Sequence, residues 1–177
     1  MRPVRPCGAR TAQTARGRWC TTLCPEKKIM SEYEEYERRC NLIREENQAI
    51  LDAFESWILA KGLSKATAKN HRENINFYIN EFLLYESPKH ASEGVDEVGM
   101  FLGYWFIRKA MWASETSIKS NAMSLKKFYD FMMERGEVTS EAVKDMKDRI
   151  KEDLPEWIAT VRRYDDPSVD VEDVWQW

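Results

Sequence analysis

Basic and amide side chains recur along residues 61–83, KGLSKATAKNHRENINFYINEFL, at intervals that place them on one side of a helix. Four of them are separated by three or four positions: Lys65, Lys69, Arg72 and Asn76. Lys61 precedes them, and no acidic residue occurs between positions 61 and 72. A cationic stripe of this kind neutralises phosphates, so the chemistry it favours is binding to a nucleic-acid backbone. The alternative is an ordinary solvated helix face.

A second stretch repeats this pattern fifty positions later. Ser64 is suited to cap the first helix, because its hydroxyl can accept a hydrogen bond from a first-turn amide. Ser114 is placed in the same way before SETSIKSNAMSLKKFYDFM. The polar side of this second helix carries Ser117, Lys119 and Lys126. Glu115 stands where the first helix has a lysine, so the second stripe is the weaker of the two.

Residue types with catalytic or metal-binding chemistry are sparse. The sequence has no glycine-rich phosphate loop, no G-x-S-x-G motif and no H-E-x-x-H motif. Its two histidines and four cysteines do not combine into a zinc site with suitable spacing. His71 falls beside apolar positions, where a hydrogen-bonded core histidine is the expected role. We therefore expect no enzyme, no metal, no cofactor and no small-molecule substrate.

The elements that must position these stripes are helices. Apolar residues recur with a period near 3.6, and no alternating runs typical of strands occur, so the fold class is all-α. We expect helices at 31–60, from Ser64 to about 83, at 95–111, from Ser114 to about 135, and from Ser140 to a stop at Pro155, with a short piece at 156–164. The helix at 95–111 is apolar nearly all round, which is typical of a buried central helix. Its Gly99 and Gly103 would let another backbone approach closely.

The helix at 31–60 carries a heptad seam with one polar member. The seam consists of Tyr33, Tyr36, Cys40, Ile43, Asn47, Ile50, Phe54 and Trp57. Packing of this seam on the chain's own domain is the favoured interpretation. A homodimer through residues 31–60 would use the same seam, with Asn47 fixing its register.

Charge divides the chain into three parts. Residues 1–29 hold seven basic residues and one acid, so the rest of the chain has a net charge of −9 against a total of −3. We expect residues 1–30 to be a disordered basic stretch, read either as an organelle transit peptide or, preferably, as translated sequence upstream of a start at Met30. Residues 31–164 form a single helical domain, and residues 165–177 form an acidic aromatic tail. For this tail we consider four alternatives: it is loose, docked on its own domain, bound to a partner, or laid over the basic stripes.

With no apolar run of about 18 residues, we expect no membrane span and a cytoplasmic protein.

Several motifs resemble the core-binding, SAM-like N-terminal domain of tyrosine recombinases, the phage integrases. The motifs are Leu51-x-x-Phe54-x-x-Trp57, Lys61-Gly62-Leu63-Ser64-x-x-Thr67, Ser114-x-x-Ser117-Ile118, Leu125-x-x-Phe128-Tyr129-x-Phe131 and Glu134-Arg135-Gly136. They cover residues 50–138, half of the chain, and consist mostly of apolar spacing. The resemblance implies a compact bundle of two crossed helical hairpins, here with a long N-terminal helix and a C-terminal helical extension.

The resemblance also implies that two capped helices lie side by side against double-stranded DNA. The residues assigned to this role are Lys61, Lys65, Lys69, Arg72, Asn76, Ser117, Lys119 and Lys126. Recombinases continue into a catalytic domain that has no counterpart here, so strand cleavage is not expected. The expected function is a non-catalytic module that grips duplex DNA. The alternative is a protein-interaction or regulatory module that kept the scaffold and lost DNA binding, which the acidic body and tail favour.

Overall fold

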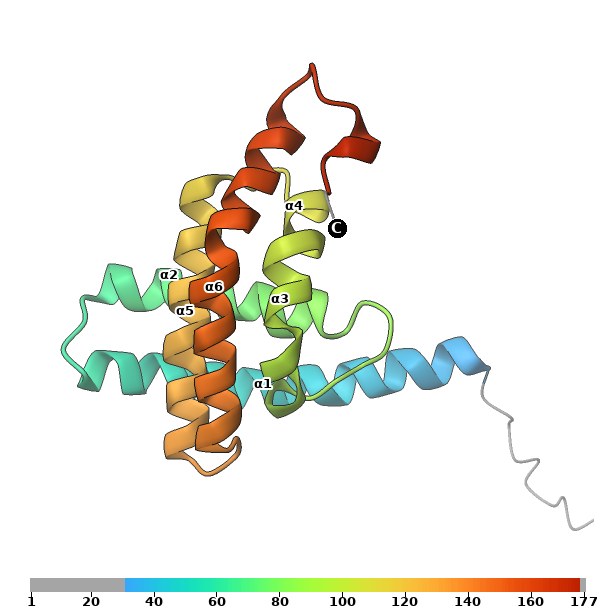
Figure 1. Ribbon diagram of the computed structural model, residues 1–177. Helices are drawn as coiled ribbons and strands as arrows, with labels where there is room; N and C mark the ends of the chain where they lie inside the picture. The colour runs from blue at the N-terminus through green and yellow to red at the C-terminus, as the bar shows by residue number, and fades with distance from the viewer. Residues whose placement is uncertain (1–30, 176–177) are drawn as a thin grey trace, which may run out of the picture.

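The computed structural model describes residues 31–175, and all regular elements within that range are helical (Figure 1). The disorder expected for residues 1–30 lies outside the described residues. The helices are α1 (Glu32–Ala60), α2 (Lys65–Phe77), α3 (Val98–Met100), α4 (Phe106–Lys109), α5 (Glu115–Glu134) and α6 (Ser140–Asp165). A π-helical turn, Tyr78–Phe82, extends α2, and a 3-10 turn, Val171–Asp173, lies in the tail.

The starts and ends of the long helices follow the capping signals of the sequence. Ser31, Ser64 and Ser114 each accept a hydrogen bond from the backbone amide three residues on, which satisfies a donor left open at the helix start. After α1 and α5 the chain turns at Gly62 (φ +87°) and Gly136 (φ +76°), a backbone conformation that favours glycine. The predicted boundaries of α1 and α5 are confirmed. The helix predicted from Ser64 to about 83 is formed by α2 together with the π-helical turn Tyr78–Phe82.

α6 corrects one prediction. It begins at Ser140, as expected, with Thr139 as its cap, but it continues through Pro155 to Asp165. Proline removes one helical hydrogen bond and usually ends or kinks a helix. Beyond it, Trp157 and Val161 are buried against the bundle, and this packing stabilises the continued helix.

The predicted central helix at 95–111 is a composite helical run. It starts earlier, with a 3-10 segment at Ala91–Glu97, passes through α3 and a π-helical segment at Phe101–Trp105, and ends with α4. Phe101 and Phe106 are fully buried, so its central position in the core is confirmed. A Cβ atom at Gly103 would lie 2.7 Å from Nε1 of Trp157. The expectation that another backbone approaches closely here is therefore wrong, because side chains of α6, Trp157 at Gly103 and Arg149 at Gly99, occupy this space.

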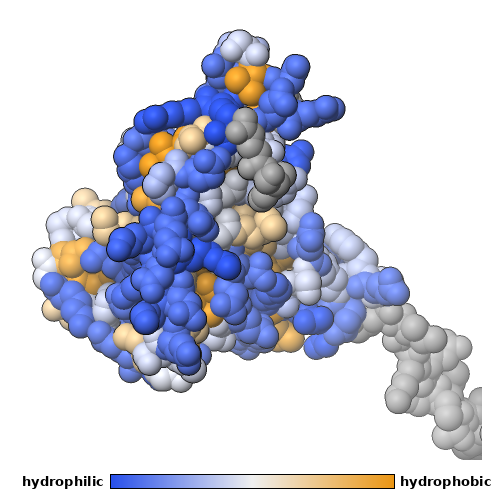
Figure 2. Space-filling view, in the orientation of Figure 1, coloured by the Kyte–Doolittle hydropathy of each residue, from blue (hydrophilic) through white to orange (hydrophobic). Residues whose placement is uncertain are grey.

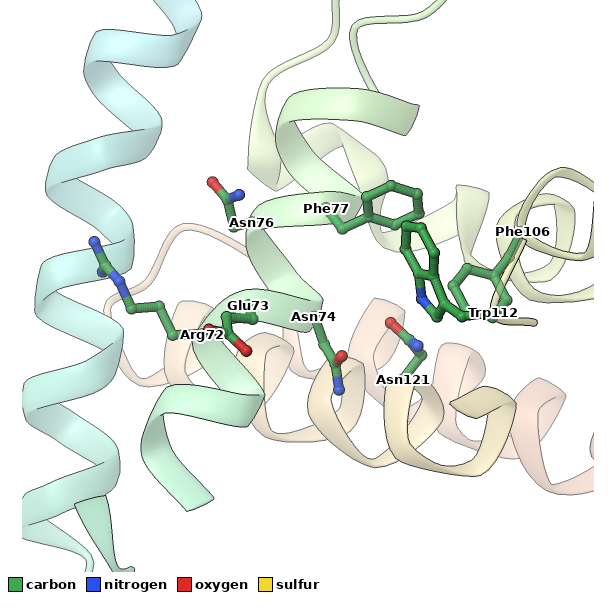
Figure 3. A pocket seen from close by; sticks show the side chains of 8 residues that line it. All are labelled: Arg72, Glu73, Asn74, Asn76, Phe77, Phe106, Trp112 and Asn121. Atoms are coloured by element: carbon green, nitrogen blue, oxygen red, sulfur yellow. The ribbon is translucent and has the colours of Figure 1, made fainter. Parts of the chain in front are cut away.

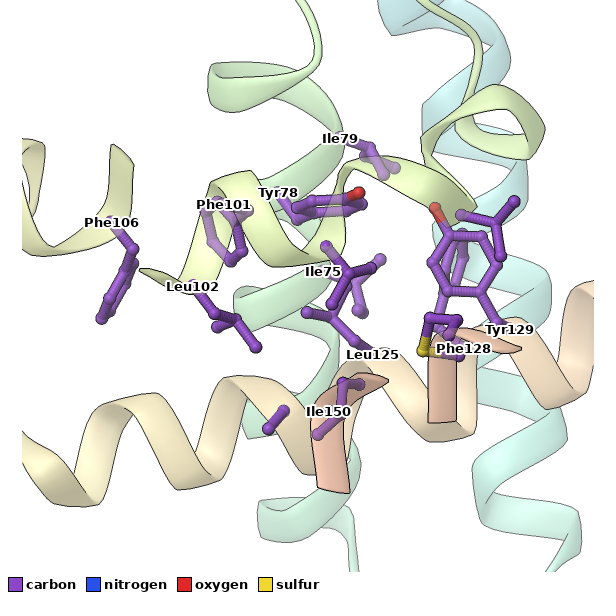
Figure 4. Packing of buried hydrophobic residues seen from close by; sticks show 14 of the residues in the cluster. Ile75, Tyr78, Ile79, Phe101, Leu102, Phe106, Leu125, Phe128, Tyr129 and Ile150 are labelled. Atoms are coloured by element: carbon purple, nitrogen blue, oxygen red, sulfur yellow. The ribbon is translucent and has the colours of Figure 1, made fainter. Parts of the chain in front are cut away.

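Two sets of helices lie across each other. α1 and α2 form an antiparallel pair, and α5, α6 and the α3–α4 run pass across that pair (Figure 1). The core occupies the crossing, where Ile75, Phe101 and Leu125 from three different helical segments meet (Figure 4). Tyr78 and Tyr129 are also buried there, and their hydroxyls donate to the carbonyls of Gly94 and Ala91.

The seam of α1 packs on its own domain, as the favoured interpretation predicts. The hydroxyl of Tyr36 donates to the carbonyl of Leu84, and Asn47 Nδ2 donates to Asn80 Oδ1 at 2.8 Å. Of the eight seam residues only Tyr33 is exposed, at 66%. The side chains that a coiled-coil dimer would share are thus occupied within the chain.

The surface over α6 is hydrophilic. Figure 2 shows polar and charged side chains along this helix, with apolar patches scattered beside it. Among residues 31–175, no helix combines the length and apolar character needed to cross a membrane.

Candidate interaction surface at the α2–α5 crossing

The two helices with the repeated pattern cross at equivalent positions. Asn70 Nδ2 donates to Ser120 Oγ at 3.2 Å, and Asn74 Nδ2 donates to Ser124 Oγ at 2.9 Å. Residues fifty positions apart therefore touch directly. Asn74 Nδ2 also donates to Ser120 Oγ at 3.0 Å. The crossing is held by small polar side chains that satisfy one another, which fixes where the two helices meet.

Ser124 is the centre of this buried hydrogen-bond network. Its hydroxyl donates to the Ser120 carbonyl at 2.9 Å, and it accepts from Asn74 and from Nδ1 of His71 at 2.8 Å. Because the carbonyl takes the hydroxyl proton, neutral His71 must carry its proton on Nδ1. Burial lowers the pKa of His71, and the charge of Lys127 lowers it further. The expectation that His71 is a hydrogen-bonded core histidine is confirmed.

The basic stripe of α2 is turned toward α1 and solvent. Arg72 is only 23% exposed, with Nη2 lying 2.8 Å from Asp52 and Nε lying 3.5 Å from Glu55, both on α1. Lys69 Nζ is 3.7 Å from Glu73, and Asn76 Oδ1 accepts from Asn80. Each of these predicted contacts to phosphate therefore has a partner in the chain itself.

Lys61 and Lys65 lie at the start of the same stripe. Lys61 Nζ is 3.1 Å from Glu134 of α5 and 4.9 Å from the centre of the Trp57 ring. Hydrogen bonds from Trp57 and then from Lys61 lower the pKa of Glu134. Lys65 is exposed and forms no ion pair with any described residue. Lys65 is thus the one residue of this stripe that keeps its charge unpaired within residues 31–175.

The second stripe is turned toward α6. Lys119 Nζ lies 2.5 Å from Glu115, whose carboxylate also accepts from Arg162 of α6. These hydrogen bonds, with that from Lys119 the larger, lower the pKa of Glu115. Ser117 Oγ belongs to the helix cap, because it accepts from the Ser114 amide at 2.8 Å. Lys126 is half-buried and makes no ion pair within the described part of the chain.

The structure does not bring the two stripes onto one face. The side of α2 that carries Arg72 faces α1. The side of α5 that carries Lys119 faces Arg162 of α6. Asn74 and Ser124 occupy the opposite sides of the two helices, where they cross. The stripes therefore lie on either side of the crossing. The expected side-by-side arrangement rested on equal spacing in the two helices, and spacing alone carries no information about how a helix is rotated against its partners.

The C-terminal tail docks away from both stripes. Trp175 Nε1 donates to the Gly103 carbonyl at 3.2 Å, and its ring lies 5.2 Å from that of Tyr104. Arg163 Nε donates to the Val174 carbonyl at 2.9 Å. Of the alternatives that the sequence leaves open, these contacts correspond to docking of the tail on the chain's own domain. The described part of the tail does not cover the lysines of α2 or α5.

A pocket of about 510 Å³ opens beside the crossing (Figure 3). Its walls are Arg72, Glu73, Asn74, Asn76, Phe77, Phe106, Trp112 and Asn121. Trp112 is 58% exposed, and its ring lies 5.3 Å from Phe77. The preceding Met111 is 98% exposed. None of the residue patterns in the sequence predicts this site. The available signal was a pair of large apolar residues directly before a helix cap, where a short turn offers nothing to bury them.

Asn121 gives the pocket a polar group without a partner. Its Nδ2 donates to the Ser117 carbonyl at 2.9 Å, while its Oδ1 is buried and accepts no hydrogen bond from any described residue.

Among residues 31–175, no cluster of His, Cys, Asp or Glu could hold a metal ion. No protein-family model matches the chain, and the searches of curated proteins and of solved structures find no significant match.

Proposed function

We propose that the chain is a helical protein-interaction module on a scaffold like the integrase core-binding domain. On this proposal the α1–α2 pair and the pair formed by the α3–α4 run and α5 are the two crossed hairpins. The observation that carries the proposal is the exposure of Trp112 in the wall of the pocket. Tryptophan is enriched in protein interfaces, and tryptophans in pockets often supply much of the binding energy.

The charges around the predicted DNA-binding residues support the same conclusion. Arg72 lies between two carboxylates, and Lys61, Lys69 and Lys119 each have a glutamate within ion-pair distance. An exposed ion pair is weak, so a phosphate could compete for the lysine. The carboxylates would nevertheless remain beside the phosphates and repel them, which lowers the affinity of a duplex for this surface.

Duplex DNA binding is the second candidate function. It is favoured by the start of α2, where Lys65 is unpaired and Lys69 is well exposed with only a long contact to Glu73. On this proposal the first stripe acts without the second. Few phosphate contacts would then be made, and the affinity would be low and strongly dependent on salt.

A pair of measurements on the full chain separates the two functions. The first is a titration of a short DNA duplex at several salt concentrations with the wild type and the Lys65→Glu/Lys69→Glu variant. We expect weak binding that the variant changes little. Tight binding that this variant abolishes would overturn the interaction proposal in favour of DNA.

The second measurement is affinity purification from cells, followed by reconstitution with purified components. We expect one stoichiometric protein partner that the Trp112→Ala variant loses and the Lys65→Glu/Lys69→Glu variant keeps. A partner retained equally by both variants would place the interface elsewhere and contradict the role of Trp112.

A further inference from the structure

We propose that the pocket beside Trp112 binds an arginine side chain of the partner protein. This inference rests on the proposed interaction function and specifies its chemistry. Its basis is that the lining of the pocket offers two amide oxygens, an aromatic face and a carboxylate, while its one guanidinium, that of Arg72, is turned toward α1. Arginine presents five N–H donors, no acceptor and a planar cation that stacks on aromatic rings, so it matches the amide oxygens, the aromatic face and the carboxylate.

The first acceptor is the side-chain oxygen of Asn121. The Ser117 carbonyl accepts from Nδ2 of this amide, and the reversed orientation would place two oxygens in contact, so the orientation is fixed. Asn121 is 4% exposed, and its Oδ1 has no donor among the described residues. A buried carbonyl oxygen without a donor is costly, and an N–H group brought by a ligand would relieve that cost. Figure 3 shows this amide beside Trp112.

The second acceptor is the side-chain oxygen of Asn74. Its Nδ2 donates to the hydroxyls of Ser120 and Ser124, which uses both of its N–H groups. The orientation is fixed, because Ser124 gives its own proton to a backbone carbonyl and can only accept from Asn74. What Asn74 can offer to a ligand is therefore its carbonyl oxygen, from the wall of the pocket that lies next to Asn121 in Figure 3.

The lining of the pocket includes one carboxylate and one guanidinium. Glu73 contributes an exposed carboxylate whose one ion-pair partner among residues 31–175 is Lys69, at 3.7 Å. Arg72 also lines the pocket, but its guanidinium is turned away from Trp112 toward α1, where Asp52 and Glu55 neutralise it (Figure 3). A guanidinium entering beside Trp112 would thus lie away from this like charge.

The aromatic wall completes the match. Trp112 offers an exposed indole face supported from behind by Phe77, and tryptophan is the best aromatic partner for a cation. A nucleobase would also stack on an indole. An amino group of the base could also donate to an amide oxygen, but the phosphate would add negative charge to a pocket that already includes the carboxylate of Glu73. This repulsion favours arginine over a nucleotide.

The test uses the isotope-labelled full chain and two small probes, N-acetylarginine amide and N-acetylcitrulline amide. Citrulline replaces the guanidinium with a neutral urea of the same shape. We expect saturable NMR shifts of the Trp112 indole N–H and of the Asn74 and Asn121 side-chain amides with the arginine probe. Loss of the charge-assisted contacts should weaken the citrulline probe about tenfold.

Three variants locate the binding. Trp112→Ala should weaken the arginine probe about fivefold, as expected for loss of an exposed cation–π contact. Glu73→Gln should weaken it by a similar factor and should make binding less dependent on salt. Met111→Ala is the matched control, since Met111 is adjacent and exposed but does not line the pocket. It should leave the affinity unchanged.

Equal affinity for citrulline, unchanged affinity in the Trp112→Ala variant, or no saturable shift would each overturn the inference. Saturable binding of AMP without a response to the arginine probe would overturn it in favour of a nucleotide. A partner that depends on Trp112 while the arginine probe does not bind would overturn this inference alone. Tight DNA binding that depends on Lys65 and Lys69 would overturn the proposed function instead.

Discussion

Nδ1 of His71 lies 2.8 Å from Oγ of Ser124 at the point where α2 crosses α5. The serine hydroxyl also donates to a backbone carbonyl of its own helix, so it holds the imidazole in one tautomer. Protonation of the ring would add a charge in a buried position near Lys127, and both effects lower the pKa of His71. The crossing of α2 and α5 is therefore also the place where acidification should lower the free energy of unfolding of the domain.

The first prediction concerns this pH dependence. In the unfolded chain His71 titrates near its ordinary value, about 6.5. Below that pH the unfolded chain binds a proton that the folded chain does not, until the pH reaches the lowered pKa of the folded state. The free energy of unfolding should therefore fall as pH drops through this window.

The measurement is urea unfolding of the wild type and the His71→Asn variant, between about pH 7.5 and about pH 5.5, a range that spans the ordinary histidine pKa. Asn places an amide donor near the position of Nδ1 and does not titrate. We expect the variant to lose less stability on acidification than the wild type. His90→Asn, at the chain's other, exposed histidine, is the control. Equal acid sensitivity of His71→Asn and the wild type would contradict the prediction.

The second prediction concerns the contact between Gly103 and Trp157. A Cβ at position 103 would lie 2.7 Å from Nε1 of Trp157 and 2.8 Å from its Cδ1, and the buried indole has little room to move. Gly103→Ala should lower the free energy of unfolding by about 1–3 kcal/mol, as overpacking of a core does. Thermal or urea unfolding measures this change.

Gly99→Ala is the matched control for that substitution, one helical turn away. Its Cβ would meet Cδ of Arg149 at 3.3 Å, and a long exposed arginine can move aside. The Gly99 variant should therefore be destabilised clearly less than the Gly103 variant. The reverse order would show that the rigid indole is not what makes position 103 intolerant of a side chain.

The sequence predicts the helices well because their signals are local. Ser31, Ser64 and Ser114 satisfy amides within their own first turns, and Gly62 turns the chain by its own backbone freedom. Pro155 led to a wrong prediction for the same reason. Its local effect is to end a helix, but burial of Trp157 against Gly103, 54 positions earlier, stabilises the continued helix.

The candidate site was less accessible from the sequence. The spacing of Lys69 and Arg72 predicts that they share a side of α2, but which element that side faces depends on tertiary packing, and α1 supplies the carboxylates. The free oxygen of Asn121 depends on the hydrogen bond that its Nδ2 donates to the backbone carbonyl of Ser117, one turn earlier in α5. Exposure of Trp112 is likewise set by the turn that carries it, so no pattern of residue types identifies the pocket.

The third prediction concerns the docked tail. Trp175 donates to the Gly103 carbonyl and packs against Tyr104 and Tyr164, and these contacts hold residues 166–174 against the domain. Trp175→Ala should raise the hydrogen-exchange rates of the amides in this segment, while the global free energy of unfolding changes little. Glu172→Gln, an exposed change in the same segment, should leave the rates as they are. Unaltered exchange in the Trp175 variant would mean that the other contacts of the tail suffice.

The fourth prediction concerns the start of α2. Ser64 Oγ accepts from the Thr67 amide at 3.1 Å, and no acidic residue in the first turn of the helix offers a substitute. Ser64→Ala should lower the free energy of unfolding by about 1 kcal/mol, because a first-turn donor loses its acceptor. Ser64→Asp should retain most of the stability, since its carboxylate can accept the same hydrogen bond and lies at the positive end of the helix. Urea unfolding of both variants at neutral pH measures the difference. If Ser64→Asp were as unstable as Ser64→Ala, then the hydrogen bond at the cap would not be what stabilises the start of α2.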